Sequence, residues 1–65
     1  MKRFTITRVA VLKNGSRRSR IVAKGEGLKA YTKAVDAIGG PFGLAFYFPM
    51  PSKDELSVQY VTDGI

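Results

Sequence analysis

The sequence predicts an α+β fold in the order ββαββ, a single small domain in which a four-stranded, mostly antiparallel sheet packs one amphipathic helix on one face. Three observations predict it: a hairpin turn between two strand-like runs, a helical spacing of apolar residues after them, and two further short strand-like runs. The chain has 65 residues, of which 45% are hydrophobic and 25% charged, as in a small globular domain. We therefore expect one domain over 1–65.

A β-hairpin is expected over residues 3–24. Asn14-Gly15, a strong two-residue hairpin signal, separates two runs that contain Thr, Ile and Val. A two-residue turn would place Val11 opposite Arg18 and give the hairpin two faces. The outward face would carry Thr5, Thr7, Val9, Val11, Lys13, Arg18, Arg20, Val22 and Lys24. The face toward the helix would carry Phe4, Ile6, Ala10, Leu12, Ile21 and Ala23, interrupted by Arg8, Arg17 and Ser19. A bulge between Arg8 and Leu12 would reverse part of this pattern.

An amphipathic helix is expected over about 27–38, where apolar side chains recur at helical spacing and Gly39-Gly40-Pro41 ends the pattern. Its inward stripe would be Leu28, Tyr31, Ala34, Val35 and Ile38. A second strand pair is expected over about 43–48 and 56–62, separated by a proline-containing segment that cannot sustain a strand. Alternation along these strands predicts the following places: Phe46 and Phe48 in the core, Tyr60 inward and Tyr47 at the surface.

The residue types exclude most familiar catalytic chemistry. The chain contains no Cys and no His, which removes the thiolate and imidazole groups of zinc sites, redox motifs and nucleophile-base pairs. Asp54 and Glu55 are adjacent, so in a strand they point to opposite sides and do not form a carboxylate pair. We expect no metal site, no cofactor and no enzymatic activity.

The positive charge is concentrated in the first half of the chain. Ten Lys or Arg residues against one Glu give residues 1–33 a net charge of +9, whereas one Lys against four acidic residues gives residues 34–65 a net charge of −3. Arginine in a β-ribbon binds phosphate oxygens bidentately, and a two-stranded ribbon fits a major groove. The expected contacts to nucleic acid, DNA or RNA, are Lys13, Arg17, Arg18, Arg20 and Lys24. We expect phosphate-dominated binding with little base readout. The plainer interpretation is that these charges only keep an edge hairpin soluble.

The same charge also fits an acidic protein partner. In this alternative the chain is a small accessory factor, an inhibitor or adaptor of the kind that phage and plasmid genes encode, and docks on an acidic protein surface. The expected protein contacts are Tyr47, Phe48 and Met50, in and beside the proline-bounded loop, although a cap over the open end of the core is the more ordinary role of the last two. A homodimer is a third alternative, with these valines at its interface: Val9, Val11 and Val22.

No targeting or membrane segment is apparent in the sequence. Residues 4–12 follow two positive charges but are interrupted by Thr5, Thr7 and Arg8, unlike the apolar core of a signal peptide. The longest uncharged run, 37–52, is broken by glycines and prolines, unlike a membrane-spanning helix. We expect a cytoplasmic protein with no membrane contact.

Overall fold

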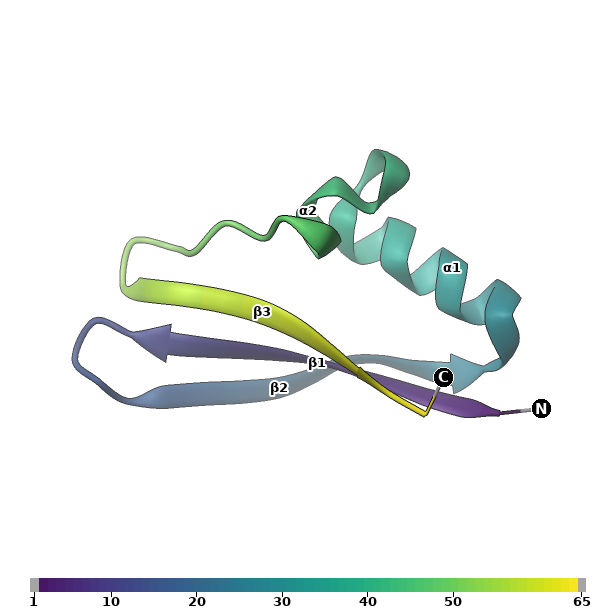
Figure 1. The fold of residues 1–65 in the computed structure, drawn as a ribbon, viewed down its shortest axis with the longest axis horizontal. Coiled ribbons are helices and arrows are strands. Elements are labelled where there is room, and N and C mark those ends of the chain that lie inside the picture. Colours follow the sequence, from purple (N-terminus) through teal and green to yellow (C-terminus); the bar gives the residue numbers. More distant parts are fainter. Residues whose placement is uncertain (1, 65) are drawn as a thin grey trace.

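A three-stranded antiparallel sheet lies against a layer of helices in the computed structural model, which describes residues 2–64 (Figure 1). The elements in chain order are β1 (Arg3–Leu12), β2 (Arg17–Glu26), α1 (Gly27–Gly39), the 3-10 turn η1 (Pro41–Gly43), α2 (Leu44–Tyr47) and β3 (Glu55–Asp63). The strand order is β2-β1-β3, so β1 is central and the other two strands are edges. Met1 and Ile65, the end residues of the domain expected over 1–65, lie outside the described residues.

The chain has the expected α+β class, but the ββαββ order with a four-stranded sheet is wrong. The segment expected to be a strand over about 43–48 contains α2, a single helical turn, and Figure 1 shows it between α1 and β3. Gly40 and Gly43 have φ angles of 71° and 65° and reverse the chain directly after α1, so residues 44–47 pack back on α1. Gly39 permits this close approach, because a Cβ atom there would lie 2.6 Å from the amide nitrogen of Phe46. Packing therefore overrides the strand preference of an aromatic-rich run.

The hairpin has a three-residue loop instead of the expected two-residue turn. The amide of Leu12 donates to the carbonyl of Ser16 at 2.8 Å, and the amide of Gly15 donates to the carbonyl of Leu12 at 2.9 Å. Gly15 has a φ of 91°, the left-handed conformation that such loops place at their third position. Asn14 does not have the positive φ that a two-residue type I′ turn requires, and its side chain instead accepts the amide of Ser16 at 2.9 Å.

This loop shifts the register of the outer half of the hairpin by one residue. Val11 lies opposite Arg17 instead of Arg18. Val22 is the extra residue of a bulge, which reverses the shift. Beyond the bulge, toward the start of β1, the expected register holds, and Ile6 pairs with Ala23. The outer β2 side chains therefore face the side opposite to the one expected. On the helix side of the sheet, which carries Ile6 and Ala10, lie Arg18 and Arg20. On the opposite side, here called the open face, lie Arg17, Ser19 and Ile21.

The core lies between the helices and one end of the sheet. Its buried apolar side chains are Phe4, Ile6, Ala10, Val35 and Phe46. The ring of Phe46 stacks on Tyr60 with centroids 5.4 Å apart, while Tyr31 meets Phe4 edge to face at 5.4 Å. Phe46 and Tyr60 thus pack inward as predicted. Tyr60 does so from the expected strand, whereas Phe46 does so from a helical turn. Three other side chains expected to pack inward are exposed: Ile21 is 59% exposed, Leu28 is 70% exposed and Phe48 is 75% exposed.

The helices cover only part of the helix side. Figure 1 shows α1 and α2 over the end of the sheet that contains the start of β1, while the hairpin loop extends past them. The segment between α2 and β3 runs beside this outer end. Among residues 2–64, no helix is both long enough and apolar enough to cross a membrane.

Candidate nucleic-acid interface

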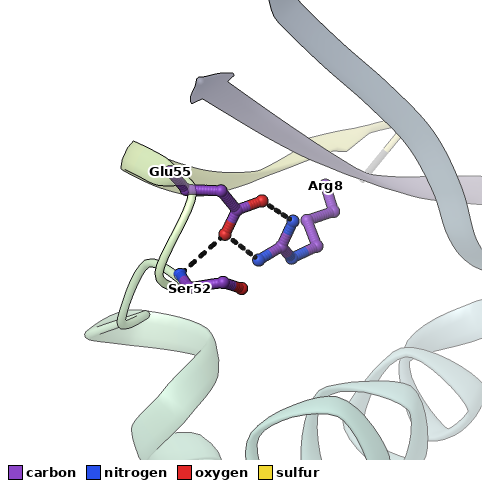
Figure 2. A network of polar contacts seen from close by, with 3 residues as sticks. All are labelled: Arg8, Ser52 and Glu55. Atoms are coloured by element: carbon purple, nitrogen blue, oxygen red, sulfur yellow. Dashed lines mark hydrogen bonds and ion pairs between the residues drawn. The ribbon is translucent and has the colours of Figure 1, made fainter. Parts of the chain in front are cut away.

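Arg8 and Glu55 form a bidentate ion pair on the helix side of the sheet (Figure 2). Both terminal nitrogens of Arg8 donate to the carboxylate oxygens of Glu55, each at 2.8 Å. The backbone amide of Ser52 donates to the same carboxylate at 2.8 Å. The carboxylate of Glu55, which is only 5% exposed, therefore has three donors, and the pair fixes the start of β3 against β1.

This pairing keeps both residues charged. The hydrogen bonds from Arg8 and Ser52 hold the pKa of Glu55 at about 2, below its ordinary value of 4.5, although burial opposes the shift. The hydrogen bond to Glu55 in turn raises the pKa of Arg8 above its ordinary value. The two opposite charges cancel, so Arg8 adds no net charge to this part of the surface.

A polar cavity of about 230 Å³ lies beside the pair. Its lining residues are Arg8, Arg18, Arg20, Ser52, Asp54 and Glu55. Arg20 lies opposite Arg8 in the β1–β2 register, and Arg18 lies opposite Ala10. Arg18 and Arg20 are both exposed, and within residues 2–64 neither takes part in an ion pair. Two guanidinium groups with unused donors therefore stand beside a third whose charge is already neutralised.

The five predicted nucleic-acid contacts do not share one face. Arg18 and Arg20 are on the helix side, whereas Arg17 and Lys24 are on the open face, and Lys13 is in the hairpin loop. The expectation that Lys24 shares a face with Arg18 and Arg20 is therefore wrong, because the bulge at Val22 lies between them. All five side chains are exposed, and they follow the edge strand β2 and its loop.

The three side chains predicted as protein contacts are all exposed. Tyr47 is 61% exposed, Phe48 is 75% exposed and Met50 is 85% exposed. Phe48 and Met50 therefore do not cap the core. They lie in the segment that joins α2 to Ser52 and the polar cavity.

The valines expected at a dimer interface do not lie on one face. Val22 packs against the core at the bulge, whereas Val9 and Val11 are half-buried on the open face. Ile21 and Val61, which were not predicted there, flank Thr7 on that face and are 59% and 44% exposed.

Sequence reasoning missed the Arg8–Glu55–Ser52 network. One signal was present: Arg8 falls among apolar residues on the face predicted to meet the helix, and an inward charge requires an acidic partner. The partner lies 47 residues away in the sequence. Spacing therefore could not show which of the acidic residues it is.

Neither a metal site among the described residues nor similarity to a known protein indicates a function. Among residues 2–64, no group of three or more acidic side chains is placed to hold a metal ion. No known protein family, curated protein or solved structure matches the chain. Function is therefore inferred from the charge and geometry of the chain itself.

Proposed function

We propose that the protein is a non-enzymatic, cytoplasmic module that binds nucleic acid through its phosphates, with Arg18 and Arg20 as the central contacts. The observation that supports this is the exposed pair of guanidinium groups beside the polar cavity, without ion-pair partners among residues 2–64. A guanidinium group matches two phosphate oxygens at once. Because Arg8 neutralises Glu55, Asp54 is the one residue lining the cavity that adds a net negative charge beside Arg18 and Arg20.

The extent of the cationic surface favours a polyanion over a small anion. Arg17 and Lys24 lie opposite Val11 and Thr5, which are six residues apart on β1, so the two cations are roughly 20 Å apart along the sheet. A single small anion does not span this distance, whereas a chain of phosphates does. Lys13 and Arg17 extend the surface around the hairpin loop and the strand edge, where a phosphate backbone contacts both faces of β2.

Fluorescence anisotropy tests this proposal. Labelled single-stranded DNA, duplex DNA and RNA of equal length are titrated with the protein at about 50 and 200 mM salt. Saturable binding is expected, with a slope of log affinity against log salt of roughly −3 to −4 for about four neutralised phosphates. The double variant Arg18→Ala/Arg20→Ala is expected to bind more weakly and to reduce the size of this slope by about 2.

A matched control separates the proposed surface from net charge. Lys29→Ala/Lys33→Ala removes the same charge from exposed positions on α1 and is expected to keep nearly the full slope. Equal effects of the two double variants would show that only net charge matters and would contradict the assigned surface. No saturable binding to any of the three ligands at low salt would contradict nucleic-acid binding and favour the acidic protein partner.

A further inference from the structure

Two exposed aromatic side chains lie at the end of α2. Phe48 is 75% exposed and Tyr47 is 61% exposed, although rings of this size are ordinarily packed. The Tyr47 ring is held in place, since its centroid is 5.1 Å from that of the buried Phe46 in an edge-to-face contact. A positioned ring that is more than half exposed offers a stacking surface for another planar group.

The packing of the core fixes the position of Tyr47 relative to the arginines. The chain of contacts runs from Tyr47 to Phe46, and from Phe46 to Tyr60, whose rings are stacked 5.4 Å apart. Tyr60 lies opposite Arg8, and Arg8 lies opposite Arg20, all on the helix side. Because neighbouring strands are about 4.8 Å apart, the Cα atoms of Tyr60 and Arg20 are roughly 10 Å apart.

Phe48 is also tied to the cavity by the chain itself. It precedes Ser52, which lines the cavity, by four residues, so the two Cα atoms are within about 14 Å of each other. Figure 1 shows this segment running from α2 toward the uncovered end of the sheet. Residues 48–52 contain no charged side chain that would separate the rings from the arginines.

We infer that the two exposed rings and the two arginines together bind single-stranded nucleic acid, with bases stacked on Tyr47 and Phe48 and phosphates bound by Arg18 and Arg20. The inference rests on the proposed function and names its ligand. The cations select a polyanion, and the exposed rings select unpaired bases, because in a duplex each base face is already covered by its neighbours. The phosphates of a duplex can bind the arginines, but its bases cannot stack on the rings.

The test compares a labelled thymidine oligonucleotide of about 12 nucleotides with a duplex of the same length, using anisotropy. Phe48→Ala is expected to weaken single-strand binding roughly 5- to 150-fold, the range for loss of one stacked base. Its salt slope is expected to stay unchanged, because no charge is removed. Phe48→Leu keeps an apolar side chain but has no ring, so it is also expected to weaken single-strand binding, and neither variant is expected to change duplex binding.

Controls make the outcome decisive. Leu28→Ala removes another exposed apolar side chain, 70% exposed on α1, and is expected to bind both ligands like the wild type. All variants are expected to keep the wild-type thermal midpoint. Wild-type affinity of Phe48→Ala or Phe48→Leu for the single strand would overturn the inference; a steep salt slope would then still support the proposed function and leave the rings as a protein-docking surface. A protein that binds neither ligand would contradict both.

Discussion

Glu55 determines which arginines are available to a ligand. It is the acidic side chain that the fold buries among residues 2–64, and both of its carboxylate oxygens bind Arg8. Arg8 therefore acts in the structure, by joining β1 to the start of β3. Arg20 lies next to it across the sheet and is exposed. The same residue type thus has a structural role at one position and a proposed binding role at its neighbour.

Stability is expected to fall in acid because of Glu55. Its folded-state pKa of about 2 is below the ordinary value of 4.5, so its carboxylate stabilises the fold above about pH 4.5, and this stabilisation is lost as the pH falls toward 2. Urea unfolding of the wild type and of Glu55→Gln from pH about 7 to about 2 measures the effect. The variant is expected to be less stable at neutral pH, and the difference is expected to shrink in acid.

The control for this prediction is Glu26→Gln, which removes an exposed ion pair with Arg3. The side chains of this pair are 50% and 86% exposed, so the change in the free energy of unfolding is expected to stay within about 1 kcal/mol. A difference between the wild type and Glu55→Gln that stays constant over the whole pH range would contradict the assigned role of the carboxylate.

At the scale of the element, α2 is attached to the fold mainly by Phe46. This ring is 8% exposed and contacts aromatic rings on either side, including Tyr60 on β3 and Tyr31 on α1. Phe46→Ala is expected to lower the free energy of unfolding by about 3–5 kcal/mol, which is comparable to the whole stability of many chains this short. Thermal unfolding followed by circular dichroism measures it.

Leu44→Ala, in the same turn but at a position 59% exposed, is expected to change stability by no more than about 0.5 kcal/mol. A cooperative transition near the wild-type midpoint in Phe46→Ala would contradict this account.

The elements that could be predicted are those with long patterns. The helical spacing from Leu28 to Ile38 covers three turns, and α1 is found at Gly27–Gly39. The run 44–48 is too short for periodicity to separate a strand from a helical turn, and its conformation depends on its packing against α1. The hairpin was predicted, but Asn14-Gly15 is compatible with a two-residue turn and with a three-residue loop, and these differ by one residue in register.

The candidate site was predictable only in its composition. The cluster of Lys and Arg residues at 13–24 is visible in the sequence, and so is the net charge of +9 over 1–33. The face on which Arg18 and Arg20 lie depends on the loop at Gly15 and on the bulge at Val22, and neither could be placed from composition. Phe48 is exposed because the residues before it form the helical turn α2. The incorrect prediction of a strand over 43–48 therefore also placed Phe48 in the core.

At the scale of the whole molecule, shape and charge act together. The chain measures 40 × 22 × 12 Å, and Figure 1 shows the hairpin loop at one end of the long axis, beyond the helices. Three exposed arginines therefore lie on the outer part of the hairpin, which has little core beneath it: Arg17, Arg18 and Arg20. Mutual repulsion among them opposes folding, and it is strongest at low ionic strength. A binding role and a structural role for these arginines consequently predict opposite effects of removing them.

Arg18→Gln/Arg20→Gln is expected to raise the stability of the free protein at low salt while weakening its binding to nucleic acid. Arg18 and Arg20 are two residues apart on the same face of β2, so removing both charges relieves their mutual repulsion, worth about 0.5 kcal/mol, or about 2–4 °C in the thermal midpoint. Salt screens the same repulsion, so the wild-type midpoint is expected to rise between about 10 mM and 1 M NaCl and the midpoint of the variant to rise less. Nucleic-acid affinity changes in the opposite direction, because salt weakens phosphate contacts. Differential scanning fluorimetry at several salt concentrations measures the first trend and anisotropy the second. If the double variant melts below the wild type at low salt, the two arginines stabilise the fold through the acidic residues of the cavity, and the proposed binding surface loses its support.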